Sequence, residues 1–210
     1  MSLRALLVEV DAGWLEEAGA PLDPALLAHA RDSALGRRLL ASWLASGPAN
    51  ALLAPDPSRD PDMVRGRWRR ERVGALCRDL GVLAHAPAIR AEVRREPVRR
   101  LKAALGNSYL LALDQSVWDG KLPPERLQEA NAGFRAALDA ALAASDAEPL
   151  YDAFDLQGRA ELQAWARRRD PALADWCRLL HPPGTVDETR ARLPEKPVLR
   201  VYTHHETRAA

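Results

Sequence analysis

Apolar residues recur every three or four positions along most of this chain, and prolines separate one such stretch from the next. That spacing places side chains on one face of an α-helix, and the face has to be buried against a partner surface. Residues 63–85 and 123–145 show the pattern most clearly. We therefore predict an all-α fold: a single compact multi-helix domain, with at most a minor strand element near the termini.

Capping residues, prolines and glycines divide the chain into further segments. Additional helices are predicted over residues 23–46, 88–95, 98–105, 156–169 and 170–181. The stretch 55–62 holds three prolines and three aspartates and is predicted to be a loop and a weak domain boundary. We assign residues 1–196 to the helical domain. Residues 197–210 are predicted to be a C-terminal tail, partly strand-like or disordered, because 198–204 reads VLRVYTH.

The composition is typical of an ordinary globular protein. The chain has 210 residues, 47% of them hydrophobic, and a net charge of +1, so no overall field attracts nucleic acid or membrane. Cys77 and Cys177 lie in apolar helical patterns and are expected to be buried free thiols. The sequence has no run of eighteen apolar residues and no secretory signal at its start. We expect a cytoplasmic protein that does not insert into a membrane.

Motifs for chemistry are missing from the sequence. It has no phosphate-binding glycine loop, no HExxH and no CxxC pair. The side chains of the adjacent His204 and His205 would point in different directions in a helix or in a strand, so the pair does not form a metal site by itself. Capping explains Asp114, Asp119 and Glu125 at least as well as acid–base catalysis. We expect no enzymatic activity, no cofactor and no metal. An active site assembled from residues distant in sequence is the alternative that this reasoning leaves open.

One basic, aromatic segment is a candidate for binding a partner. It comprises Arg65, Arg67, Trp68, Arg69, Arg70 and Arg72. Three interpretations are open: a solvated helix face in which Trp68 is a core anchor, a nucleic-acid grip, or a docking patch for an acidic protein. Residues 59–102 carry thirteen basic and six acidic side chains, whereas 103–158 carry three and nine. The acidic turn with Asp114, Trp118 and Asp119 is therefore the second candidate interface.

Two segments resemble the SctK family of type III secretion proteins, whose members include YscK and PscK. The run VGALCRDLGVLAHAPAIRAEVRREPVRRLKAALGNSYLLALD at 73–114 has a helix, Leu-Gly, a short helix with Ile-Arg, and Leu-x3-Leu-Gly before another apolar turn. The segment LQAWARRRDPALADWCRLLHPPG at 162–184 is similar to the C-terminal part of that family. Chain length and helical character agree throughout, although the motif consists only of Leu, Gly and Arg at helical spacings.

This resemblance implies a structural role in a secretion machine. Members of the family are cytoplasmic adaptors of the sorting platform, recruited to the cytoplasmic face of the inner membrane. They are expected to link the cytoplasmic domain of the ring protein SctD to the SctQ pods, and through these to SctL and the secretion ATPase. The alternative function is a helical nucleic-acid-binding protein that uses residues 65–72. An interaction module of another machine is a further possibility.

Overall fold

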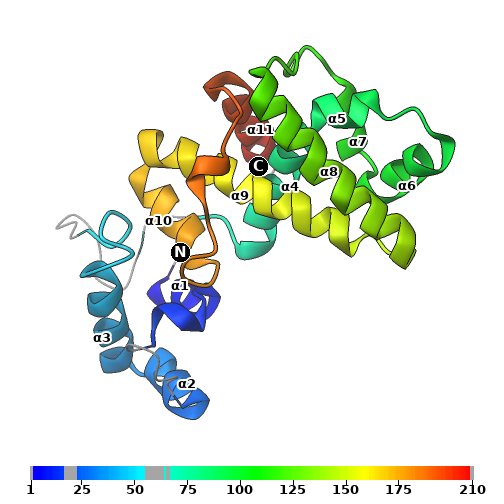
Figure 1. Cartoon of the computed structure of the whole chain (residues 1–210). Helices are drawn as coiled ribbons and strands as arrows, with labels where there is room; N and C mark the ends of the chain where they lie inside the picture. The colour runs from blue at the N-terminus through cyan, green and yellow to red at the C-terminus, as the bar shows by residue number, and fades with distance from the viewer. Residues whose placement is uncertain (1, 17–22, 55–63, 65–66, 209–210) are drawn as a thin grey trace. The chain divides into compact units, whose positions relative to one another are not determined.

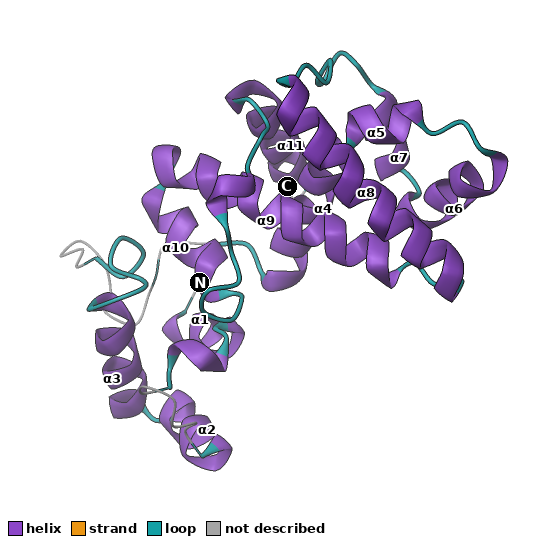
Figure 2. Ribbon diagram, in the orientation of Figure 1, coloured by secondary structure: helices purple, strands orange, loops and turns teal. Residues whose placement is uncertain are grey.

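The computed structural model describes residues 2–16, 23–54, 64 and 67–208. Over these ranges the chain forms eleven α-helices and two short 3-10 turns, and no β-strand occurs in them, which confirms the predicted all-α fold (Figure 2). The structure comprises two compact units, each built from two separate stretches of the chain. Unit 1 contains residues 1–73 and 166–187, and unit 2 contains residues 74–165 and 188–210. The predicted boundary at 55–62 lies in a part of the chain that is not described.

In the described part of unit 1, four helices lie wholly within the unit and are labelled in Figure 1: α1 (Leu3–Glu9), α2 (Pro24–Asp32), α3 (Ala34–Ala45) and α10 (Pro171–Leu179). The predicted helix over 23–46 is in fact two helices, because Ser33 ends α2 and its hydroxyl accepts a hydrogen bond from Gly36 N at 3.0 Å. At Gly36, a side chain would lie 2.3 Å from the carbonyl oxygen of Ala30. This close approach lets α3 fold back onto α2, and both helices also pack against α1.

Unit 2 contains most of α4 (Arg70–Ala84) and α9 (Glu148–Arg169), together with α5 (Ala86–Ala91), α6 (Arg95–Leu105), α7 (Ser108–Leu113), α8 (Pro124–Ala144) and α11 (Glu195–Thr207). Helices α5 and α6 each pack against both α7 and α8. The largest fully buried side chains of this unit include Phe154, Leu80, Ile89 and Leu138. Its core therefore draws on α4, α5, α8 and α9.

Two glycines allow α4 and α9 to cross at backbone contact. A Cβ on Gly81 would lie 1.8 Å from the carbonyl oxygen of Phe154, and one on Gly158 would lie 1.6 Å from that of Cys77. Both positions lie within regular helix, where glycine is less favourable than alanine by roughly 0.5–1 kcal/mol. The close crossing is therefore the structural reason for glycine at these two positions.

A buried carboxylate attaches the segment after α10 to the core of unit 2. Glu161 of α9 accepts hydrogen bonds from the backbone N–H groups of Arg192 and Leu193, at 2.9–3.0 Å, and from Gln157 Nε2 at 2.6 Å. Burial raises the pKa of Glu161, while these hydrogen bonds act in the opposite direction. The three donors satisfy a carboxylate that would otherwise be costly to bury.

The C-terminal segment differs from its prediction. Residues 198–204 form part of α11, so the expected strand-like or disordered tail is wrong over the described residues. Val198 and Val201 are buried, and the ring of Tyr202 packs against Trp165 with centroids 5.0 Å apart. Positions 198, 201, 202 and 205 have helical spacing, and burial of that face overrides the strand preference of β-branched residues.

Helix α9 also begins earlier than predicted, at Glu148 rather than near 156. Its additional turns bury Leu150 and Phe154, and Trp165 near its end is also buried. None of the described helices combines the length and apolar character needed to cross a bilayer.

Candidate protein-interaction surfaces

The basic segment predicted to bind a partner is largely engaged within unit 1. Arg67 donates two hydrogen bonds of 3.1 Å to the carboxylate of Asp170, and its side chain is only 8% exposed. Asp170 also caps α10 by accepting a hydrogen bond from Leu173 N. The Arg67 guanidinium is therefore part of the packing of unit 1. Arg65 lies outside the described residues.

The other residues of this segment have similar internal roles. Arg70 donates to the carbonyl oxygens of Leu180 and Glu9, while the Glu9 carboxylate accepts from Arg70 N at the start of α4. The Trp68 carbonyl accepts a hydrogen bond from the buried Trp176, and the Arg72 guanidinium stacks 3.8 Å from the Trp68 ring. Arg69 is exposed. These contacts favour a structural role over a grip on phosphates.

The acidic turn holds a buried tryptophan. Trp118 is 5% exposed, so our expectation of an exposed contact at this residue is wrong. Arg90 of α5 donates to the carbonyl oxygens of Ala112 and Trp118 at 2.7 and 2.8 Å and so holds this turn. The carboxylates of Asp114 and Asp119 are exposed and accept hydrogen bonds from backbone N–H groups two residues on. Both carboxylates therefore stabilise turns in the loop between α7 and α8, and neither accepts a hydrogen bond from the first turn of a helix, so the expected capping role is wrong for both.

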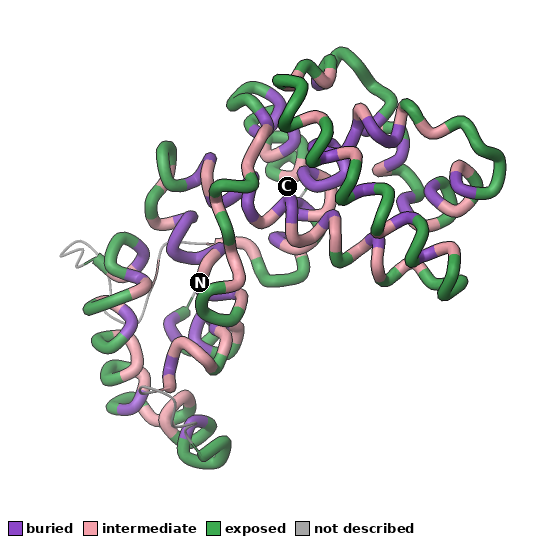
Figure 3. The backbone as a smooth tube through the Cα atoms, viewed as in Figure 1, coloured by how far each residue is buried: buried purple, intermediate pink, exposed green. Residues whose placement is uncertain are grey.

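The structure reveals a different candidate surface, which the sequence analysis missed. Leu35, Leu39 and Trp43 follow one another at four-residue intervals along α3, and they are 71%, 63% and 50% exposed. We call these three side chains the α3 stripe. Leu44 lies on the other side of α3 and is fully buried, and the tube of this helix in Figure 3 alternates between exposed and covered positions. Helix α3 thus has two apolar faces, of which only one is covered.

The indole of Trp43 is held in place within this surface. Its Nε1 donates a hydrogen bond of 3.1 Å to the carbonyl oxygen of Trp14. The charged side chains of α3 are Arg37 and Arg38, and the helix contains no carboxylate. The α3 stripe is therefore an apolar surface in a basic setting. Large exposed apolar side chains that lie together on a surface are typical of protein-binding sites.

A signal for this surface was present in the sequence. Residues 34–45 read ALGRRLLASWLA, and the leucines and the tryptophan together cover about half of the helix circumference, which is wider than one core-facing stripe needs. From the sequence, residues 23–46 are predicted as one helix, without a second side that meets a partner. The packing of α1 and α2 decides which face of α3 remains uncovered. The residue spacing within α3 does not contain that information.

Unit 2 has a smaller surface of the same kind. Leu110 and Leu113 of α7 are 64% and 43% exposed and are separated by three residues, so they lie on one face of the helix. Among the described residues, no group of three or more His, Cys, Asp or Glu side chains is placed to hold a metal ion. The exposed apolar faces of α3 and α7 are therefore the candidate binding surfaces of this chain.

Comparison with family models, with curated proteins and with solved structures finds no match to this chain.

Proposed function

We propose that this chain is a protein-binding adaptor and that the α3 stripe is one of its docking surfaces. The observation that supports the proposal is the exposure of Leu35, Leu39 and Trp43 on a helix whose other face is already packed. Covering a large apolar side chain contributes roughly 1.5–3 kcal/mol, so three such side chains provide the centre of a specific interface.

The chemistry of α3 indicates what kind of partner fits. Arg37 donates to the carbonyl oxygens of Arg31 and Asp32, so Arg38 is the exposed charge of α3, and an apolar surface with a neighbouring carboxylate complements it. A second copy of the same helix would place arginines near arginines, and this like-charge arrangement disfavours self-association. The proposed partner is therefore another protein that presents an apolar helix face beside acidic residues.

Within that class, we propose the role implied by the resemblance to the SctK family. The chain would connect the cytoplasmic domain of SctD with SctQ, and through SctQ with SctL and the secretion ATPase. Such an adaptor is cytoplasmic, is recruited to the inner-membrane ring and needs no catalytic residues. The resemblance of residues 73–114 and 162–184 to the SctK family supports this role in the sorting platform. The α3 stripe supports the more general role of a protein-binding adaptor.

The test measures binding of the full chain to purified SctD cytoplasmic domain and to SctQ by isothermal titration calorimetry. We expect that Leu35→Ser combined with Leu39→Ser weakens one of the two complexes by about tenfold or more. Because both side chains are exposed, helical content and melting temperature should remain those of the parent chain. The control is Val93→Ser, which removes an exposed apolar side chain that belongs to neither apolar surface and should leave both affinities unchanged.

The outcomes separate the two parts of the proposal. If the parent chain binds neither SctD nor SctQ, its role in the sorting platform is rejected. If it binds and the α3 variant binds equally well, the α3 stripe is not the docking surface. Capture of nucleic acid that weakens steeply with salt would favour the alternative function through residues 65–72.

A further inference from the structure

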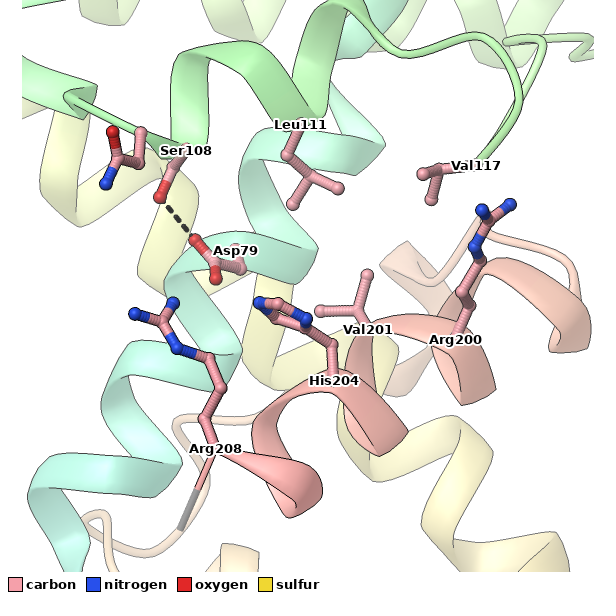
Figure 4. A pocket seen from close by; sticks show the side chains of 9 residues that line it. Asp79, Ser108, Leu111, Val117, Arg200, Val201, His204 and Arg208 are labelled. Atoms are coloured by element: carbon pink, nitrogen blue, oxygen red, sulfur yellow. Dashed lines mark hydrogen bonds between the residues drawn. The ribbon is translucent and has the colours of Figure 1, made fainter.

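Unit 2 contains a cavity of about 310 Å³ that neither the sequence analysis nor the proposed function explains. It lies among α4, α7, α11 and the loop that follows α7 (Figure 4). Its size is at the lower end of the range typical of sites for small molecules, roughly 300–1,000 Å³. Its lining includes Asp79, Leu111, Val117, Arg200, Val201 and Arg208.

Helix α11 gives this cavity a cationic wall. Arg200, His204 and Arg208 are spaced by four residues, so their side chains project from one face of the helix. The two guanidinium groups originate about 12 Å apart along the helix axis. Figure 4 shows Arg208 on the side of Asp79, His204 in the middle and Arg200 on the side of Val117.

Asp79 is the only carboxylate among the residues that line the cavity, and it has partners of its own. Its Oδ1 accepts a hydrogen bond from Ser108 Oγ, and its Oδ2 lies 2.8 Å from His205 Nε2. Among the described ion pairs, none joins Asp79 to Arg200 or Arg208. The Asp114 carboxylate interacts electrostatically with Arg200, whereas no described ion pair neutralises Arg208, so Arg208 is the cation of this wall that is open to an anion.

The two arginines differ in how far they are engaged. Arg200 Nη1 donates a hydrogen bond of 2.8 Å to the carbonyl oxygen of Ser116, which orients its guanidinium beside the loop and leaves further N–H donors. The Arg208 side chain is exposed at the end of α11. Leu111, Val117 and Val201 form an apolar part of the cavity wall. The cavity thus combines guanidinium groups with a surface suited to a small hydrocarbon body.

We propose that this cavity binds a small organic anion, in which a carboxylate or phosphate group is attached to a compact apolar body. The anionic group would contact the guanidinium of Arg208 or Arg200, because guanidinium groups pair with both kinds of oxyanion through two parallel hydrogen bonds. The apolar body would lie against Leu111, Val117 and Val201. This inference is independent of the adaptor role, because it concerns a different surface and a different class of ligand.

The experiment titrates the full chain with phenyl phosphate, benzoate, inorganic phosphate and phenol by isothermal titration calorimetry. Phenyl phosphate or benzoate should bind more tightly than inorganic phosphate, which has no apolar body, and than phenol, which has no anionic charge. Which of the first two binds more tightly distinguishes phosphate from carboxylate as the preferred group. Each R208Q and R200Q substitution should weaken binding of the better anion by about tenfold.

The control is R99Q, which removes an exposed arginine of α6 that does not line the cavity. Its affinity should equal that of the parent chain. R208Q keeps the result interpretable if R200Q disturbs the loop by losing the Ser116 contact. The proposal is overturned if neither organic anion binds at 10 mM. It is also overturned if phenol binds as well as phenyl phosphate, or if R208Q and R200Q both have the same affinity as the parent chain.

Discussion

His85 illustrates how the core of unit 2 controls an ionisable side chain. The imidazole is 4% exposed and lies 6.0 Å from the Phe134 ring and 5.8 Å from the Phe154 ring, measured between centroids. Burial, reinforced by the charge of Arg192, lowers its pKa to about 3. The residue was predicted only as a helix end, and the structure places it there, at the junction of α4 and α5. Its neutrality is a consequence of packing.

This burial predicts a specific dependence of stability on pH. In the unfolded chain His85 takes up a proton near pH 6.5, whereas in the folded chain it does so only near pH 3. Protons therefore favour unfolding between these values, and stability falls as pH decreases by up to about 1.4 kcal/mol per pH unit from this group. Urea unfolding at pH 7 and pH 4.5 should show a larger loss for the parent chain than for His85→Leu.

Glu161 acts in the opposite direction, because its raised pKa makes protonation favour the folded chain. It is present in both chains, so it cancels in the comparison. His29→Gln, at an exposed position of α2, is the control and should retain the pH dependence of the parent chain. Equal pH dependence in the parent and His85→Leu chains would show that His85 titrates normally.

At the scale of elements, helix formation and helix packing are decided by different residues. Prolines at the first turns of α2, α8 and α10 mark where those helices begin, and local chemistry explains them. The crossing of α4 and α9 instead depends on Gly81 and Gly158, which are separated by more than seventy residues in sequence. Neither glycine is favourable within its own helix, so only the opposing backbone explains it.

Two glycines of α4 provide a matched pair for testing this crossing. Gly81→Ala should destabilise the chain by about 3 kcal/mol or more, because its methyl group would overlap the backbone of Phe154. At Gly74 nothing lies within 4 Å of the same added atom, so Gly74→Ala should stabilise the chain by about 0.5–1 kcal/mol. Urea unfolding monitored by circular dichroism measures both. Equal changes in the free energy of unfolding for Gly81→Ala and Gly74→Ala would mean that α4 and α9 are not in backbone contact.

At the scale of the whole molecule, each unit is assembled from two distant stretches and contains one buried cysteine. Cys177 belongs to unit 1, and Cys77 belongs to unit 2. Burial raises the pKa of the Cys77 thiol to about 12. Because the thiolate is the reactive form, both inaccessibility and this pKa make the residue inert in the folded chain.

The two thiols therefore report on the two units separately. We expect a thiol reagent such as Ellman's reagent to modify neither cysteine in the native chain and to modify both in urea. In the Gly81→Ala variant, Cys77 should react before Cys177, because the substitution disrupts the crossing at which Cys77 lies. Peptide mass mapping of the modified sites measures this order. Rapid modification of Cys77 in the parent chain would contradict the buried position.

The sequence by itself determined the helical class and the starts of α2, α8 and α10, each of which has a proline in its first turn. These features follow from apolar spacing and from capping, both of which act within a few residues. Tertiary structure decided that residues 198–204 are helical, that Arg67 and Trp118 are engaged inside their units, and that the α3 stripe is exposed. The physical reason is that burial depends on surfaces brought together from distant parts of the chain, which local patterns do not specify.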